Sequence, residues 1–324
     1  MSQLHEIRNP IEQELVAFKR IFDESIDSSN PLLNQAIHHI KQSSGKMMRP
    51  ILVLLLAKLH GEVKPETLYA AVSLELLHTA SLVHDDVVDE SGIRRGQQSV
   101  NALFDNRLSV LVGDYLLATS LMQVSKTRNF EIIDVVSRLG QQLAEGEILQ
   151  LSNIENKAFS EEVYFKIIYK KTAALFAACA KSAALSSGAS SSVVDEMTKF
   201  GELLGICFQI KDDIFDYSKS NAIGKPTGND MLEGKLTLPA LYVLNQKTTP
   251  QLTQLAYLVK EGKATSQDIN LFMDLIIDRG GITYAEQVMI AYGKQALAII
   301  DDLPDSPIKQ SLIDYLDYIV LRKK

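Results

Sequence analysis

Apolar side chains recur at helical spacing along most of the chain. Near the N-terminus, Ile7, Ile11, Leu15, Phe18 and Phe22 are four, four, three and four residues apart, so they form one stripe along a helix. Asn30-Pro31 interrupts this pattern, and a second helix is expected to start there. The same spacing predicts further helices over 46–60, 65–90, 99–126, 131–151, 161–186, 192–217, 232–244, 251–261, 266–278, 284–302 and 306–322.

The pattern therefore predicts an all-α protein, because no convincing run of alternating apolar and polar residues indicates strands. The stretch 173–184 is apolar nearly all round and is expected to be central. No Gly/Ser-rich linker and no solenoid-type repeat divides the chain, so we expect a single domain over 1–324. One long polar stretch, 217–234, is rich in Gly, Asn and Pro and is expected to be a functional, lid-like loop.

Charge and composition narrow the function. A net charge of −7 argues against a nucleic-acid partner, although local basic clusters could still bind small phosphorylated molecules. The two cysteines, Cys179 and Cys207, lie in apolar stretches and are expected to be reduced core thiols. No signal-peptide pattern appears at the N-terminus, and the longest apolar run, 51–57, is far shorter than a membrane span. We expect a cytoplasmic protein with at most peripheral membrane contact.

Two Asp-Asp-x-x-Asp motifs carry the candidate chemistry. They are formed by Asp85, Asp86 and Asp89, and by Asp212, Asp213 and Asp216. Four-residue spacing stacks the first and last carboxylates of each motif on one helix face, where they repel unless water or a cation lies between them. One such motif is also typical of a solvated charged face. Two motifs inside otherwise apolar helices favour Mg²⁺, which binds carboxylates together with substrate phosphates.

Basic residues near these motifs could hold phosphate. Lys46 and Arg49 are three residues apart at an expected helix start, and Arg94 and Arg95 follow the first acidic motif in a Gly-flanked turn. Lys171 precedes an apolar run, and Lys225 and Lys235 bracket the long loop. Taken singly, each of these residues except Lys171 is better explained as solvated surface charge.

Two other kinds of site are disfavoured. His84-Asp85 invites comparison with helical metal-dependent phosphohydrolases, but the remaining histidines show no ligand-like spacing. The stretch from Gly228 to Lys235 fails as a nucleotide P-loop, because five residues separate its glycines and Leu236 follows the lysine.

The chain resembles the all-trans isoprenyl diphosphate synthases over nearly its whole length, and most closely the long-chain octaprenyl and solanesyl diphosphate synthases. The matching blocks are GKMMRP (45–50), ELLHTASLVHDDVVDESGIRRG (75–96), LVGDYLLA (111–118), EGEILQL (145–151), KTAALF (171–176) and GICFQIKDDIFDY…GKPTGNDMLEGKLTLPALY (205–242). The resemblance implies the isoprenoid synthase fold, a bundle of roughly a dozen helices around a deep central cavity, usually homodimeric. It implies a prenyltransferase that condenses an allylic diphosphate, such as farnesyl or geranylgeranyl diphosphate, head-to-tail with successive isopentenyl diphosphates.

The resemblance also implies roles for single residues. About three Mg²⁺ per site would be held across the cavity mouth, with Asp85, Asp89 and Asp212 as direct ligands. Asp86, Asp213 and Asp216 would support them through waters or indirect bonds, and Asp216 is also assigned to the metal site. The allylic diphosphate would be held by the metals and by Arg94, Lys171, Thr172, Gln209, Lys225 and Lys235. Isopentenyl diphosphate would be held by Lys46, Arg49, His78 and Arg95. The catalytic set comprises the six aspartates and Lys171.

An apolar tunnel for the growing chain is expected below the first acidic motif. Ala80, Ser81 and Leu77 would line one wall, and Val112, Leu116 and Leu143 the opposite wall. In the family, a Phe or Tyr at the position of Ala80 stops elongation early, so a small residue there implies a long product. The sequence alone also allows plain close packing of small residues at this place.

Three alternatives stay open. The chain could be a short-chain farnesyl or geranylgeranyl diphosphate synthase, or a catalytically silent subunit of a heteromeric synthase. The intact acidic motifs count against the silent subunit. A terpene cyclase or head-to-head synthase shares the helical class, but it would not need Lys46, Arg49 and Arg95 as a second diphosphate-binding set.

Overall fold

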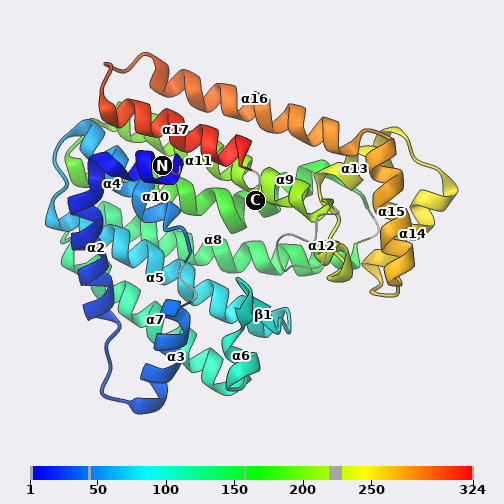
Figure 1. Cartoon of the computed structure of the whole chain (residues 1–324), viewed down its shortest axis with the longest axis horizontal. Helices are drawn as coiled ribbons and strands as arrows, with labels where there is room; N and C mark the ends of the chain where they lie inside the picture. Colours follow the sequence, from blue (N-terminus) through cyan, green and yellow to red (C-terminus); the bar gives the residue numbers. More distant parts are fainter. Residues whose placement is uncertain (1–2, 43–44, 157, 219–227, 323–324) are drawn as a thin grey trace. The chain divides into compact units, whose positions relative to one another are not determined.

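The computed structural model describes residues 3–42, 45–156, 158–218 and 228–322 (Figure 1). The regular secondary structure of this part of the chain is helical apart from one antiparallel hairpin of two-residue strands, β1 (Ile93–Arg94) and β2 (Gln97–Gln98). The helices are α1 (Gln3–Arg8), α2 (Glu12–Ser25), α3 (Pro31–Gln42), α4 (Met48–His60), α5 (Pro65–Val88), α6 (Val100–Leu103), α7 (Asn106–Lys126), α8 (Phe130–Glu155), α9 (Glu161–Ile168), α10 (Ala174–Ser187), α11 (Ser191–Asp216), α12 (Asn229–Leu232), α13 (Leu238–Gln246), α14 (Pro250–Lys260), α15 (Ser266–Asp278), α16 (Gly281–Asp301) and α17 (Pro307–Leu321). The predicted all-α class is confirmed.

The chain divides into two compact units. Unit 1 comprises Met1–Gln141, Leu175–Gly201 and Ile299–Tyr315, and unit 2 comprises Gln142–Ala174, Glu202–Ala298 and Leu316–Lys324. The single domain expected over 1–324 stays a prediction.

Unit 1 is built around α5, which α7 accompanies along its length (Figure 1). The helices α2 and α4 also pack against α5. The stripe predicted from the N-terminal sequence supplies part of this core, since Ile7, Ile11 and Phe18 are fully buried. The stripe is not one continuous helix, however, because a short 3₁₀ turn at Asn9–Ile11 separates α1 from α2. Pro10 in that turn lacks the N–H that a continuous helix needs.

Unit 2 has its own apolar core. Phe272, Met273 and Ile276 of α15 are buried there with Leu252 and Val259 of α14. The helix α13 contacts both α15 and α9, and α12 contacts α14. These contacts hold α12 and α13 against α14 and α15.

Three predicted helices are interrupted. The stretch 99–126 breaks after α6, because the Asp105 side chain accepts the Leu108 N–H and starts α7 afresh. The stretch 161–186 contains a π-helical turn, Tyr169–Ala173, between α9 and α10. Within the stretch 232–244, α12 ends at Leu232 and Gly234 follows with φ +77°. The next helix, α13, begins after Thr237 with Pro239 in its first turn. The other predicted helices agree with the structure to within a few residues.

Among the described helices, α7 is the one long and apolar enough to cross a membrane by length and composition alone. This is weak evidence for a span, since a core helix of similar composition passes the same test. Here α7 packs along α5 and carries buried polar residues, Ser109, Ser120 and Gln123.

Candidate active site

The first acidic motif lies at the C-terminal end of α5 in unit 1. Asp85 is in the last turn of the helix, and the N–H of Asp89 donates to the Asp85 carbonyl oxygen at 2.8 Å. Both side chains are half-buried. The two residues are thus one helical turn apart, as their four-residue spacing predicts.

Asp86 has a different surrounding from its neighbours. It is buried and accepts a hydrogen bond from Nε of Arg94 at 2.8 Å, and the Arg94 Nη2 also contacts it. Its backbone carbonyl accepts from Asn101 and from the Ser91 N–H. Asp86 thus ties the β1–β2 hairpin to α5 and holds the guanidinium of Arg94, a predicted diphosphate ligand.

A basic cluster surrounds His78 in the same unit. Burial lowers the pKa of His78 well below its ordinary value, and the nearby charges of Arg49, Arg95 and Arg94 lower it further. His78 is therefore neutral near pH 7. The Arg49 guanidinium lies over the Phe176 ring at 5.5 Å, and its buried Nε has no hydrogen-bond partner among the described residues. The chemistry of these arginines and a neutral histidine suits an anion.

Gly45 allows Arg95 to lie against the backbone. A Cβ at Gly45 would be 3.0 Å from Cζ of Arg95 and 3.1 Å from both terminal nitrogens. Arg95 itself has φ +52°, in the left-handed region. The predicted pair of Lys46 and Arg49 is arranged differently from expectation, since α4 begins at Met48 and leaves Lys46 in the exposed preceding segment.

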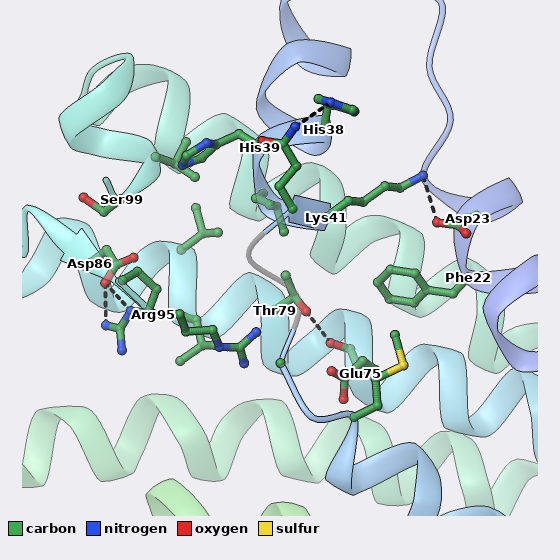
Figure 2. Close-up of a pocket in the computed structure, with 18 of the residues that line it drawn as sticks. Phe22, Asp23, His38, His39, Lys41, Glu75, Thr79, Asp86, Arg95 and Ser99 are labelled. Atoms are coloured by element: carbon green, nitrogen blue, oxygen red, sulfur yellow. Dashed lines mark hydrogen bonds and ion pairs between the residues drawn. The ribbon is translucent and has the colours of Figure 1, made fainter. Parts of the chain in front are cut away.

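A cavity of about 470 Å³ opens beside this cluster. Figure 2 shows Glu75, Thr79 and Asp86 following one another along α5 on the side that lines the cavity, with Arg95 beside them. Glu75 is a residue that sequence reasoning missed. Burial raises its pKa, and the charges of Arg49 and Arg95 act in the opposite direction. Glu75 is thus a half-buried acidic residue facing the charges of Arg49 and Arg95.

His84 does not join Asp85 in a metal site. Its Nε2 lies 3.2 Å from the Val110 carbonyl oxygen and 3.4 Å from Oδ1 of Asp114, both on α7. Its ring occupies the place of a side chain at Gly113, where a Cβ would be 2.1 Å from His84 Nε2. The structure therefore explains His84 by packing between α5 and α7, which removes the basis for a His-Asp phosphohydrolase.

In unit 2, Asp212 of the second motif pairs with an arginine near the end of the chain. Nη2 of Arg322 lies 2.5 Å from Oδ1 of Asp212 and also donates to the Phe208 carbonyl oxygen. The guanidinium stacks 4.1 Å above the Phe208 ring. Arg322 was not predicted, because its partner is 110 residues away in the sequence.

Asp213 is the centre of a buried hydrogen-bond network. The Tyr164 hydroxyl donates to Oδ2 of Asp213 at 2.6 Å, and Nε2 of Gln209 donates to Oδ1 at 2.8 Å. The Thr172 hydroxyl donates to Oε1 of Gln209 at 2.7 Å. Burial raises the pKa of Asp213 to about 7, although both hydrogen bonds oppose this shift. Thr172 and Gln209, which were both predicted to hold the allylic diphosphate, are thus joined by a hydrogen bond.

Asp216 caps the next helix. Its carboxylate oxygens accept the N–H groups of Asn229, at 3.0 Å, and Asp230, at 3.1 Å, at the start of α12. Burial raises the pKa of Asp230 well above its ordinary value, and Asp216 and Asp213 add to this effect. Lys235, a predicted diphosphate ligand, pairs with Glu233 at 2.5 Å. Lys225 lies outside the described residues.

The π-helical turn presents Lys171 and Thr172 from successive positions. Lys171 forms an ion pair with Glu147 of α8, and Lys170 forms one with Glu145. Gly146, between these glutamates, lets α8 approach the turn, since a Cβ there would lie 2.8 Å from Cβ of Lys170. The glutamates of the EGE sequence therefore position the two lysines.

The predicted tunnel residues lie in two units. Leu77 and Ala80 of α5 are buried, as are Val112 and Leu116 of α7, and Ser81 is half-buried. Leu143 is half-buried in unit 2. The cavity of Figure 2 is lined by other residues of α5, so the tunnel stays a prediction.

The carboxylates fit Mg²⁺ by their chemistry. Asp85 and Asp89 offer hard oxygen donors one turn apart. Over the described ranges, no three His, Cys, Asp or Glu side chains gather closely enough to hold a metal ion by themselves. The two carboxylates of Asp85 and Asp89 suit Mg²⁺, because this ion takes most of its ligands from water and substrate phosphate.

Comparison with known proteins identifies the family. The sequence pattern described as "Polyprenyl synthetase" matches residues 30–276. The chain belongs to the polyprenyl synthetase family. It is 35% identical to the octaprenyl diphosphate synthase of Haemophilus influenzae, over 89% of this chain and 88% of that one. Among solved structures, it is similar to a geranylgeranyl pyrophosphate synthase from Bacteroides thetaiotaomicron, with 55% identity, a TM-score of 0.89 and coverage of 99% and 100%. It is also similar to a decaprenyl diphosphate synthase from Rhodobacter capsulatus, with 35% identity, a TM-score of 0.93 and coverage of 99% of each chain.

These likenesses confirm the predicted resemblance and the isoprenoid synthase fold. This polyprenyl synthetase is a prenyltransferase of isoprenoid biosynthesis that elongates a prenyl diphosphate.

Sequence reasoning missed several partners of the predicted residues. They are Glu75, Glu147, Tyr164, Asp230 and Arg322. For Glu75 a signal was available, because an acidic residue inside the apolar run of α5 needs a buried partner. Tyr164 carries no such signal, since a tyrosine on a half-buried helix is ordinary.

Proposed function

We propose that this prenyltransferase condenses an allylic diphosphate with successive isopentenyl diphosphates, in a Mg²⁺-dependent reaction, and releases a long-chain all-trans polyprenyl diphosphate. The observation that carries this proposal is the arrangement of unit 1. The stacked carboxylates Asp85 and Asp89 suit a metal-bound diphosphate, whereas Arg49 and Arg95 around His78 suit a second diphosphate without a metal.

Two kinds of anion site have a chemical reason. When bound, Mg²⁺ supplies positive charge to the departing diphosphate of the allylic substrate. Lys171 and Lys235 add charge to the same leaving group. Isopentenyl diphosphate must keep its C–O bond, so it is held by Lys46, Arg49, His78 and Arg95 and by no metal ion. Breaking the C–O bond of the allylic diphosphate leaves a carbocation, which the oxygens of Thr172 and Gln209 stabilise.

The rest of the reaction balances without a protein base. The double bond of isopentenyl diphosphate attacks the allylic cation and forms the new C–C bond. A proton then leaves C2 of the former isopentenyl unit, and the released diphosphate accepts this proton. The neutral state of His78 agrees with this assignment, because the surrounding arginines oppose its protonation.

A long product is supported by the octaprenyl and decaprenyl relatives and by the small side chain of Ala80. A geranylgeranyl-length product is the second candidate, favoured by the 55% identity to a structure described with that activity. Incubation with farnesyl diphosphate, labelled isopentenyl diphosphate and Mg²⁺, followed by chromatography of the dephosphorylated products, separates them. Accumulation of geranylgeranyl diphosphate under excess isopentenyl diphosphate would reject the long-chain proposal.

Ala80→Phe tests the tunnel directly. A dense interior offers no spare room, so the larger ring should shorten the main product and leave the Mg²⁺ requirement unchanged. An unaltered product would mean that Ala80 does not line the tunnel.

We also propose that the protein is a homodimer, because α7 has an exposed apolar side. Leu111 and Met122 of α7 are each 63% exposed, and Val110, Leu117 and Leu121 share the exposed side of this helix. An apolar surface of this kind suits a second copy of the chain. Sedimentation should give twice the chain mass, and Leu121→Glu should shift it toward the monomer. A wild-type monomer at micromolar concentration would contradict the dimer. We also place the protein in the cytoplasm with at most peripheral membrane contact, which cell fractionation tests.

A further inference from the structure

We propose that Tyr164 is a positioning residue that fixes the orientation of the Gln209 amide and, through it, of the Thr172 hydroxyl. This proposal rests on the proposed function, in which the oxygens of Thr172 and Gln209 face the allylic cation. The hydrogen bond of the Tyr164 hydroxyl goes to Asp213 and not to either of these residues. Tyr164 acts through Asp213.

The hydrogen bonds of this network run in one direction. Tyr164 and Asp213 are both buried, with 5% and 2% of their surfaces exposed. The Tyr164 hydroxyl donates to one oxygen of Asp213 and the Gln209 amide nitrogen donates to the other, so both oxygens of Asp213 accept in this network. The Gln209 amide must therefore turn its oxygen toward Thr172, and the Thr172 hydroxyl must donate to it at 2.7 Å. The lone pairs of Thr172 then remain available to a cation.

A glutamine amide has nearly the same shape in its two orientations, so only its partners choose between them. If the amide were reversed, its NH₂ group would point at Thr172 and would present positive partial charge near the cation. Oδ1 of Asp213 opposes this reversal, because it accepts from the Gln209 NH₂ group at 2.8 Å, and a reversed amide would set two oxygens against each other. Asp213 in turn is held by Tyr164, which reaches across from α9 to α11 with a short 2.6 Å bond.

Loss of the Tyr164 hydroxyl should consequently slow the chemical step more than it weakens substrate binding. Tyr164→Phe removes one donor and keeps the ring. The matched control is Tyr284→Phe, since the half-buried Tyr284 in the same unit donates to Oε2 of Glu161 at 2.8 Å and has no bond to this network. The assay is a single-turnover measurement of the first condensation, so that release of product does not mask the chemistry.

We expect Tyr164→Phe to lower the single-turnover rate about 10- to 100-fold. KM for both substrates and the Mg²⁺ concentration for half-activation should change less than about threefold, because the charged groups proposed to hold the diphosphates and the metal keep their side chains. Tyr284→Phe should keep the wild-type rate. Thermal unfolding of both variants checks that each is folded. A Tyr164→Phe rate equal to that of the control would overturn the proposal.

A double-mutant cycle tests whether Tyr164 acts through Thr172. In a Thr172→Val background the hydroxyl is already lost, so adding Tyr164→Phe should cost less than about threefold more. A full repeat of the single-mutant loss would also overturn the proposal, since it would mean that Tyr164 acts elsewhere.

Asp213→Asn provides a second route if Tyr164→Phe unfolds. The asparagine oxygen can still accept from Tyr164, but its NH₂ group would face the Gln209 amide and force it to reverse. The rate should fall with little change in KM, and a wild-type rate would contradict the proposal. Failure of the proposed function is distinguishable, because the wild-type chain would then transfer no prenyl group at all.

Discussion

The close approach of α8 to the π-helical turn makes Gly146 a sensitive position for substitution. In Gly146→Ala the new Cβ would lie 2.8 Å from Cβ of Lys170, 2.9 Å from Cγ of Lys171 and 3.2 Å from the Lys171 backbone nitrogen. Carbon atoms in ordinary contact are about 3.5–4.0 Å apart, so the two segments must separate by about 1 Å. One of the contacted atoms belongs to the backbone, and rotation of a side chain alone therefore cannot relieve the clash.

The cost has two parts. Overpacking of this kind destabilises a protein by about 1–3 kcal/mol, and the better helix propensity of alanine offsets about 0.5–1 kcal/mol of it. The larger effect should be on activity, because a displacement of about 1 Å at a substrate-holding group can cost about 100-fold. Since Lys171 is proposed to hold the allylic diphosphate, KM for that substrate should rise more than KM for isopentenyl diphosphate.

Steady-state kinetics with each substrate varied, together with urea unfolding, would measure both parts. The control is Gly140→Ala on the same helix, where a Cβ would meet nothing within 4 Å. This variant should be more stable than wild type by about 0.5–1 kcal/mol and fully active. If Gly146→Ala kept the wild-type KM for the allylic substrate, or changed both KM values equally, the assignment of Lys171 would be refuted.

Three further predictions concern the first acidic motif and the arginine cluster of unit 1. Asp85→Ala should lower turnover at least about 100-fold with an unchanged circular dichroism spectrum, and EDTA should abolish activity that Mg²⁺ restores; full activity in EDTA would exclude the metal role. Arg49→Ala should raise KM for isopentenyl diphosphate more than KM for the allylic primer. Arg49→Lys should also be impaired, because an ammonium group cannot replace the bidentate hydrogen bonds of a guanidinium. Equal effects on both KM values would argue against two separate anion sites. Because the folded-state pKa of His78 is depressed, the folded protein binds fewer protons than the unfolded chain, so stability should fall as pH drops below about 6.5. His78→Gln should flatten that slope in urea titrations, and an unchanged slope would assign the effect to other groups.

Helix positions could be predicted from sequence wherever apolar spacing and terminal residues agreed. The stretch 266–278 matches α15 at both ends, because Thr265 and Asp268 form a capping box that also appears in the sequence. The break before α7 was missed, although Asp105 is a good helix-starting residue, because the apolar spacing continues across it. The π-helical turn was missed because one extra residue within a helix leaves no recognisable mark when the sequence on both sides remains helical.

The candidate site was predictable as a set of residues but not as a set of bonds. The two aspartate motifs are visible because like charges cluster at helical spacing, and Arg94 and Arg95 are visible as adjacent basic residues in a Gly-flanked turn. Their division of labour is not visible, since Asp86 faces Arg94 and Asp216 caps α12 for reasons of local geometry. Partners far away in the chain, such as Arg322 for Asp212, depend on tertiary packing that no local pattern records.

The two buried cysteines have a practical consequence for labelling. Cys179 and Cys207 are free and buried, and burial raises the pKa of each thiol to about 12. Since the thiolate is the reactive form, neither should react with maleimide reagents at neutral pH while the protein is folded. A single cysteine introduced at an exposed position, such as Ser137→Cys on α8, would therefore take a fluorophore or spin label selectively. The native sequence already serves as a cysteine-silent background for spectroscopy, with no further substitution.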